Sequence, residues 1–230
     1  MGFVDQFVEW ANRGLGESDE AQEYLTGRGV SQDQWARHRL GFSGGDFSVD
    51  PGLDSGHDPA VCGDRDKKHL RCDSCRYIAW SSSWELVEGC ARRQQTVGRR
   101  IARSIVFPLT NYAGQVVGFQ VRSLDVKSYD TFTVSRRPEG YFFGIGPNMD
   151  AIWSSREVWL VEGGPDQLIL ERLVAPNVIA LTTSAIGKLQ LLFLRRFVRI
   201  VNLCLDIDAG GRKGVRSFFR FNAADFDTRD

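Results

Sequence analysis

The stretch "RIVNLCLDIDAGGRKGVRSFFRF", residues 199–221, carries the clearest structural pattern in the chain. An apolar run typical of a buried strand ends on two acids in alternate positions, Asp206 and Asp208, and a glycine-rich turn leads into a predicted helix. Residues i and i+2 of a strand point to the same face, so the two carboxylates are expected to converge. Because like charges repel, a cation between them is favoured, and Mg²⁺ typically binds one or two protein carboxylates together with phosphate oxygens.

Strands and helices alternate upstream of this stretch. Residues 158–161, 178–183 and 199–208 are predicted as strands, and residues 165–174, 187–197 and 211–221 as helices. This alternation is typical of an α/β unit with a mainly parallel sheet, in which ligands bind beyond the carboxyl ends of the strands. Glu162 ends the first strand in "WLVEGGPD", so three carboxylates are expected at one edge of the sheet.

The region before this unit has a different pattern of predicted elements. The first forty residues predict two or three short helices, with capping pairs at Asp19 and Gln22 and at Ser31 and Gln34. Residues 104–124 predict two strands joined by the turn "NYAG", and Pro108 indicates an edge or a strand end. We therefore expect an α+β N-terminal subdomain over residues 1–150, with a Cys-containing insertion at about 50–92, followed by an α/β subdomain over residues 151–230.

Composition narrows the class of protein. The 230 residues are 42% hydrophobic and 25% charged, which is ordinary for a globular chain with a sizeable core. The sequence has no uninterrupted apolar stretch of the length that crosses a membrane, no signal-type start, and Gln6 breaks the myristoylation pattern that Gly2 would begin. These features predict a cytoplasmic protein without a membrane partner.

The charges balance at 29 basic and 29 acidic residues but are unevenly placed. "ARRQQTVGRRIAR", residues 91–103, and "LRRFVR", residues 194–199, are basic clusters without an acid. Each is either a solvated helix face or a patch that binds phosphates, and composition does not decide between the two.

Two motifs carry a family resemblance. "LVEGGPDQLIL" and "LDIDAGGRKG" resemble the signature motifs of the TOPRIM fold, which topoisomerases and bacterial-type primases share. Upstream, "YLTGRGVSQDQWARHRLGF" and "RSIVFPLTNYAGQVVGFQVRSL" resemble segments of the catalytic core of bacterial and phage DNA primases. The likeness covers residues 22–42 and about 99–220. It implies a primase-type N-terminal subdomain and a TOPRIM subdomain that is short at its C-terminus.

The resemblance also implies site residues. Glu162, Asp206 and Asp208 are expected to bind Mg²⁺ or Mn²⁺, and Asp166 matches a further acid of the first motif. Gly163, Gly210 and Gly211 match positions of close approach. Residues expected to face the template or the incoming nucleotide are Arg99, Arg100, Arg103, Arg122, Lys127, Arg212 and Lys213. For Arg122 the alternative is an ordinary hairpin arginine.

The cysteines suggest a second metal. Cytoplasmic thiols argue against disulfides, and Cys204 is expected to be a core residue. The pair in C-x-x-C spacing predicts structural Zn²⁺, which would stiffen an insertion poor in apolar residues; free thiols are the alternative. The candidate ligands are Cys62, Cys72, Cys75 and Cys90, with His57 and His69 nearby.

The expected function is metal-dependent synthesis of short RNA primers on single-stranded DNA in replication. Its partners would be the DNA template, ribonucleoside triphosphates, and a replicative helicase or a separate primase chain. The short C-terminus and the missing leading zinc module leave open a split or minimal primase, a fragment, or a derivative without activity. The alternatives are a TOPRIM nuclease that uses the same acids, and a non-catalytic replication subunit that binds single-stranded DNA or a helicase.

Overall fold

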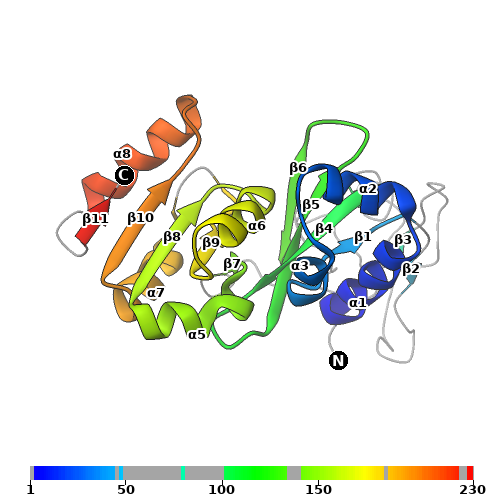
Figure 1. The fold of residues 1–230 in the computed structure, drawn as a ribbon, viewed down its shortest axis with the longest axis horizontal. Coiled ribbons are helices and arrows are strands. Elements are labelled where there is room, and N and C mark those ends of the chain that lie inside the picture. The colour runs from blue at the N-terminus through cyan, green and yellow to red at the C-terminus, as the bar shows by residue number, and fades with distance from the viewer. Residues whose placement is uncertain are drawn as a thin grey trace, which may run out of the picture. The chain divides into compact units, whose positions relative to one another are not determined.

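The computed structural model describes residues 3–44, 47–48, 79–80, 101–133, 141–183, 186–222 and 227–229 (Figure 1). The helices are α1 (Phe3–Gly16), α2 (Asp19–Gly27), α3 (Gln32–Arg37), α5 (Ile145–Ser155), α6 (Gly164–Leu173), α7 (Lys188–Phe197) and α8 (Ala209–Asn222). The strands are β1 (Gly41–Phe42), β2 (Phe47–Ser48), β3 (Ala79–Trp80), β4 (Ser104–Thr110), β5 (Val116–Ser123), β6 (Tyr129–Thr133), β7 (Phe142–Phe143), β8 (Glu157–Val161), β9 (Val178–Ala180), β10 (Ile200–Cys204) and β11 (Asp227–Arg229). None of the helices in these ranges has the length and apolar character needed to cross a membrane.

The chain forms two compact units, and each is assembled from several stretches of sequence. Unit 1 contains Met1–Leu25, Arg39–Pro108 and Val117–Arg137, and unit 2 contains Thr26–His38, Leu109–Val116 and Pro138–Asp230. Strand β4 contributes residues to both units, since the division falls between Pro108 and Leu109.

Unit 1 is an antiparallel arrangement of strands with α1 packed beside it. Strand β1 pairs with β4, and β5 pairs with β6, both in antiparallel register. Helix α1 contacts β1, and its buried Phe7 lies with its ring centroid 4.2 Å from that of Phe119 on β5. Strands β4 and β5 are buried along almost their whole length, and α1 adds an apolar stripe of buried residues, namely Val4, Phe7, Val8 and Ala11; together these residues form the core.

Unit 2 has strands in the order β11–β10–β8–β9–β7, with the end of β4 beyond β7. Parallel pairing joins β11, β10, β8 and β9, and β7 pairs with both of its neighbours in antiparallel fashion. The expectation of a mainly parallel sheet is therefore wrong: the sheet is mixed, and over its whole extent antiparallel pairs predominate. The helix crossovers specify only the parallel strands, whereas the two-residue β7 carries no periodic signal in the sequence.

The core of unit 2 lies between these strands and three helices. Buried side chains of α5, α7 and α8 pack against those of β8, β9 and β10; they include Ile152, Leu160, Ile179, Phe193, Leu203 and Phe218. Helix α6 follows β8 directly, so the carboxyl end of that strand and the start of α6 form one turn. In Figure 1, β8 and β10 run side by side, in agreement with their register.

A buried polar network ties α3 to α6. The Glu171 side chain is only 4% exposed, and it accepts hydrogen bonds from Arg37 (2.5 Å) and Gln167 (2.6 Å) and lies 2.7 Å from His38 Nε2. Gln34 Nε2 adds a bond of 2.6 Å to the carbonyl of Leu168. Residues far apart in the sequence thereby fix the orientation of α6.

The local predictions fare unevenly. Ser31 and Gln34 form the expected capping box, and the turn at Asn111 joins β4 to β5 as expected. At α2 the cap is Ser18 rather than Asp19, because the Ser18 hydroxyl accepts the Ala21 N–H at 3.3 Å.

Two further expectations are wrong. Pro108 lies inside β4, not at an edge or end; the register with β1 stops at Val106 and that with β7 starts at Leu109, so the proline without an N–H falls where one partner strand replaces the other. Cys204 is exposed rather than part of the core. It is the last residue of β10, one position after Leu203, which faces the core, so it points to the opposite face.

Candidate active site

Glu162 follows the last residue of β8 and opens the turn into α6. The Thr182 N–H donates to the Glu162 carbonyl oxygen at 2.9 Å, which anchors this turn to the end of β9. Gly163 is the N-cap of α6, with Pro165 in the first turn, where its missing N–H costs no helical bond. The motif "EGGPD" therefore fixes an acid at the boundary between strand and helix.

Asp206 and Asp208 lie beyond β10 and not within it. The strand ends at Cys204, so the expectation that both acids share one strand face is wrong. They occupy the turn into α8, whose tip projects outward, since Ile207 is 89% exposed. Asp208 Oδ1 accepts the Gly211 N–H at 2.9 Å, and its carbonyl accepts the Arg212 N–H at 3.1 Å, so Asp208 also caps the helix.

The acids of the second turn act on the acid of the first. Burial raises the pKa of Glu162, and the negative charges of Asp206 and Asp208 raise it further, although a hydrogen bond from the Asp206 backbone opposes them. Because β8 and β10 are neighbouring parallel strands, their carboxyl ends meet at one edge of the sheet. The structure thus brings Glu162, Asp206 and Asp208 together across two strand ends.

Asp166 belongs to the same electrostatic group. Burial and then the charge of Asp206 raise its pKa, while a hydrogen bond from the Gly163 backbone and the charge of Arg28 lower it, and the net direction is upward. Arg28 did not stand out in the sequence, because an arginine between helices carries no spacing signal. The structure adds it as a cation that acts on this group.

The arrangement fits a divalent cation in its chemistry. Glu162 Oε1 is buried and has no hydrogen-bond partner among the described residues, and the charged form of a carboxyl group whose pKa is raised by burial and by neighbouring acids is stabilised when a cation lies beside it. Within the same part of the chain, no three His, Cys, Asp or Glu side chains are grouped closely enough to hold a metal ion. The side chains thus supply carboxylate oxygens, which divalent cations prefer, but the described residues do not hold them in a preformed cluster.

The glycines of the second turn have an internal role. A Cβ on Gly211 would lie 1.8 Å from the carbonyl oxygen of Asp206, so the close approach is to the chain's own backbone. Gly163 is less tight, since its Cβ would lie 3.0 Å from Asp166 Oδ2. Gly210 lies in the first turn of α8. These contacts explain why small residues separate the acids from the helices.

The basic residues expected at the site fall into three groups. Arg212 and Lys213 are exposed in the first turn of α8, directly after the acids, and Arg212 Nη1 donates to the carbonyl of Ile207. Arg103, Arg122 and Lys127 belong to unit 1. The third group, Arg99 and Arg100, lies outside the described residues. The candidate zinc ligands Cys62, Cys72, Cys75 and Cys90 and the neighbouring His57 and His69 lie outside them as well.

In unit 1, Arg122 and Arg103 interact with side chains and carbonyl groups of the same unit. Arg122 is buried, its Nη1 donates to the carbonyl of Ser123 at 2.6 Å, and its guanidinium lies 5.2 Å from the centroid of the Tyr129 ring. Arg103 is exposed and pairs with Glu20 at 2.5 Å and with Asp125 at 3.3 Å. Arg122 thus stabilises the β5–β6 hairpin, whereas Arg103 and Lys127 present charge at the surface.

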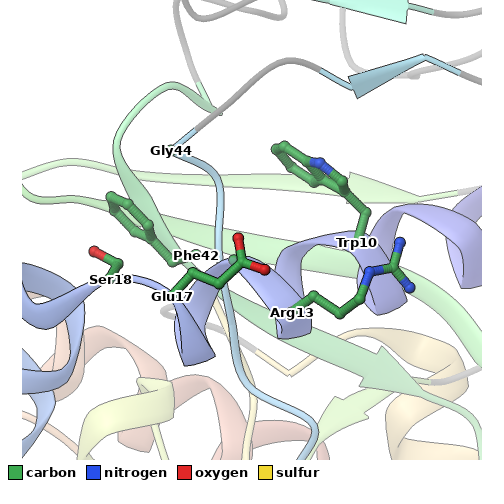
Figure 2. Close-up of a pocket in the computed structure, with 7 residues that line it drawn as sticks. Trp10, Arg13, Glu17, Ser18, Phe42 and Gly44 are labelled. Carbon is green, nitrogen blue, oxygen red and sulfur yellow. The ribbon is translucent and has the colours of Figure 1, made fainter.

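A separate concave site lies in unit 1, with a volume of about 310 Å³. Figure 2 shows Trp10 and Phe42 among its walls, with Arg13, Glu17 and Ser18 around them. Its lining residues include none of the carboxylates of unit 2. The carboxylate edge of unit 2 is therefore the stronger candidate for chemistry.

Comparison with known proteins gives a consistent likeness. A DNA primase of Clostridium acetobutylicum is 25% identical over 226 residues, which cover 94% of this chain and 34% of the relative. The zinc-binding and RNA polymerase domains of Aquifex aeolicus primase align over 94% of this chain and 50% of that one, with a TM-score of 0.66 and 23% identity. A DnaG primase catalytic domain bound to single-stranded DNA aligns over 98% of this chain and 70% of that one, with a TM-score of 0.66 and 18% identity.

No protein-family profile matches the sequence. The chain spans about a third of the curated relative and half of the Aquifex aeolicus chain. The chain is similar to bacterial DNA primases in sequence and has the fold of their catalytic cores.

Proposed function

We propose that the chain is the catalytic core of a DNA primase and makes short RNA primers on single-stranded DNA. One observation carries the proposal: Glu162 at the end of β8, Asp166 in the first turn of α6, and Asp206 and Asp208 beyond β10 form one electrostatic group on a primase-core fold. Nucleotidyl transfer needs this kind of group, because phosphate oxygens and a developing oxyanion must be stabilised at one place.

In this proposal Glu162, Asp206 and Asp208 hold Mg²⁺ or Mn²⁺, with Asp166 beside them. When bound, such a cation lowers the pKa of an attacking hydroxyl and neutralises phosphate charge. The chain's own residues orient the group: Thr182 anchors Glu162 through its carbonyl, and Asp208 is fixed by its bond from Gly211. Arg212 and Lys213, exposed just after the acids, are placed to attract a triphosphate.

The proposed partners follow from that chemistry. The template would be held through its phosphates, which provide affinity without base recognition. A replicative helicase or a separate primase chain is part of the proposal, as is structural Zn²⁺ on the cysteines between residues 62 and 90. Each of these can be tested on the purified chain.

The decisive experiment compares the wild type with Asp206→Asn/Asp208→Asn on single-stranded templates, with labelled ribonucleotides and Mg²⁺ or Mn²⁺. The amide at position 208 can still accept the Gly211 N–H, so the variant should fold. We expect short RNAs from the wild type and a loss of roughly 10²-fold or more in the variant. Equal synthesis by both proteins would refute the proposed site.

The same experiment separates the alternatives. A nuclease that uses these acids would shorten the DNA in the absence of ribonucleotides, and the double variant would stop that degradation. A non-catalytic replication subunit would bind single-stranded DNA equally well with and without the acids and the cation, and would make no RNA. Glu23→Gln, which removes an exposed carboxylate in unit 1, serves as the control for general loss of negative charge.

A further inference from the structure

Helix α7 presents an unusually basic surface. Between Glu171 and Asp206 the sequence contains no acidic residue. The outward positions of α7 and of the turn after it are Lys188, Leu189, Leu192, Arg195, Arg196 and Arg199, all exposed. Three exposed cations on α7 and a fourth in the turn after it make this side of the helix attractive to anions.

An aromatic cluster adjoins these cations. Phe197, at the end of α7, has its ring centroid 5.9 Å from that of Tyr112 in the β4–β5 turn and 5.6 Å from that of Trp153 on α5. Phe193 lies 4.9 Å from Phe197 and is nearly parallel to Tyr112, with an interplanar angle of 20°. Tyr112 is nonetheless 46% exposed and Trp153 49% exposed. The inner rings support two outer rings that are open to solvent.

Arginines are placed directly on the rings. The guanidinium of Arg156 lies 4.4 Å from the centroid of the Trp153 ring, and that of Arg196 lies 5.4 Å from the Phe197 centroid. The carbonyl of Arg156 accepts the Arg199 N–H at 2.7 Å, and its Nη1 donates to the Phe197 carbonyl at 3.3 Å. The end of α5 and the end of α7 are therefore joined before any partner binds.

This surface is distinct from the carboxylate edge of the same unit. Arg156 and Arg199 come immediately before β8 and β10, whereas Glu162 and Asp206 come after them. Because the two strands are parallel, the arginines and the acids lie at opposite ends of the strands. Asp150, the acid nearest to Trp153 along α5, lies three positions before it.

We propose that this aromatic–arginine surface, formed by Tyr112, Trp153, Phe197 and the cations of α7 and Arg156, binds single-stranded nucleic acid. Exposed rings interleaved with cations provide both elements that such a strand requires, since bases stack on aromatic faces and the phosphates pair with arginine. An acidic protein would use the cations alone and would have no need of the open ring of Tyr112. The surface would hold a strand independently of the acids.

The test measures binding of a fluorescein-labelled oligothymidylate to the whole chain by fluorescence anisotropy. Tyr112→Leu/Trp153→Leu should weaken binding at least about five-fold for each ring that stacks on a base. Arg196→Gln/Arg199→Gln should reduce the slope of log K against log salt by about 0.7 for each phosphate that the variant no longer neutralises. The matched control is Leu173→Ala, an apolar residue of α6 that is 68% exposed.

A second measurement guards against misfolding. Photocrosslinking of an oligonucleotide that contains 5-iodouracil to the wild type, followed by mapping of the peptides, should label Tyr112 or Trp153. The ring substitutions should change the affinity for a duplex of the same sequence very little, because the bases of a duplex are already stacked on one another. Unchanged single-strand affinity in the ring variant, or crosslinks found only elsewhere in the chain, would overturn the inference.

The result does not depend on primer synthesis. If the chain makes no RNA but the ring variant loses affinity, the binding surface is supported and the proposed function is rejected. If the chain makes primers and the ring variant binds single strands as the wild type does, the proposed function is supported and the binding surface is rejected. Binding that disappears only on removal of the arginines would indicate a phosphate patch and reject base stacking.

Discussion

Glu171 joins helix α6 to the end of α3 within unit 2. Its carboxylate is almost fully buried, and Arg37, His38 and Gln167 all bind it. Removal of one partner from a buried pair leaves a desolvated charge and commonly costs about 3–5 kcal/mol. Since the Arg37 side chain is 44% exposed and can regain water, we expect Glu171→Gln to lower the free energy of unfolding by about 3 kcal/mol, at the lower end of that range.

Urea denaturation of Glu171→Gln would measure this loss, with Glu23→Gln as its control. Glu23 is an exposed glutamate of α2, so its neutralisation should change stability by less than about 0.5 kcal/mol. Equal midpoints for the wild type and Glu171→Gln would show that the buried carboxylate contributes nothing net.

Glu171 should also set the acid limit of stability. Burial acts to raise its pKa, but the hydrogen bond and charge of His38, the bond from Gln167 and the charge of Arg37 outweigh burial and lower the pKa. A carboxyl whose pKa is lower in the folded state stabilises above its unfolded value and loses that effect as the pH falls through the folded one. The wild type should therefore lose stability below about pH 4.3, the ordinary glutamate value, more steeply than Glu171→Gln. Thermal midpoints measured between pH 7 and pH 3 decide this, and parallel curves would contradict it.

Glu162 should behave in the opposite way. Its pKa is raised by burial and by Asp206 and Asp208, so its contribution to stability is full below the ordinary glutamate pKa and is lost as the pH rises through the folded value. With chelator present at pH 7, Glu162→Gln should be more stable than the wild type. Added Mg²⁺ should raise the midpoint of the wild type and leave that of the variant nearly unchanged. Calorimetry with and without Mg²⁺ tests both statements, and a less stable variant in chelator would reject the first.

At the scale of the elements, the turn between β10 and α8 depends on Gly211. A Cβ there would lie 1.8 Å from the carbonyl oxygen of Asp206, and that atom belongs to the backbone and cannot swing aside. Gly211→Ala should cost about 2 kcal/mol or more and displace both acids, because the turn must open to admit the methyl group. Gly16→Ala is the matched control: its Cβ would meet nothing within 4 Å, and it should be neutral or slightly stabilising. Thermal denaturation and primer synthesis of both variants give the comparison.

Local patterns predicted most of these elements. Apolar periodicity and glycine turns predicted helices α6, α7 and α8. The acids were predicted because they follow apolar strands, where ligands commonly bind. All of these signals depend on residues within a few positions of one another. The Ser31 capping box is local in the same sense. The end of β10 was not predictable, because Leu205 continues the apolar run in the sequence, whereas the pairing of the strand stops at Cys204.

Long-range partners were beyond the sequence. His38 and Arg37 meet Glu171 across more than 130 positions, and no periodicity connects residues at that separation. The same holds for Arg28 beside Asp166 and for the aromatic cluster of Tyr112, Trp153 and Phe197. Each of these residues has an ordinary local context, so its role is visible only once the fold is known.

At the scale of the whole molecule, the interleaved units make a specific demand on folding. Unit 2 includes Thr26–His38 and Leu109–Val116 as well as Pro138–Asp230, so its C-terminal segment is incomplete by itself. In a fragment of Pro138–Asp230, Glu171 would lose Arg37 and His38, and β7 would lose its pairing with Leu109 and Thr110 on β4. A desolvated acid and an unpaired edge of the sheet each oppose folding.

We therefore expect the Pro138–Asp230 fragment to show poorly dispersed amide resonances and no cooperative thermal transition, whereas the whole chain shows both dispersion and cooperativity. The physical reason is that the buried Glu171 carboxylate can be ionised in a folded core only with its partners from Thr26–His38 present. Glu171→Leu in the same fragment removes that burial cost, so it should restore part of the cooperativity if the lost ion pair is the main obstacle. A wild-type fragment with native-like dispersion would show instead that the parallel strands and their helices fold without help from the rest of unit 2.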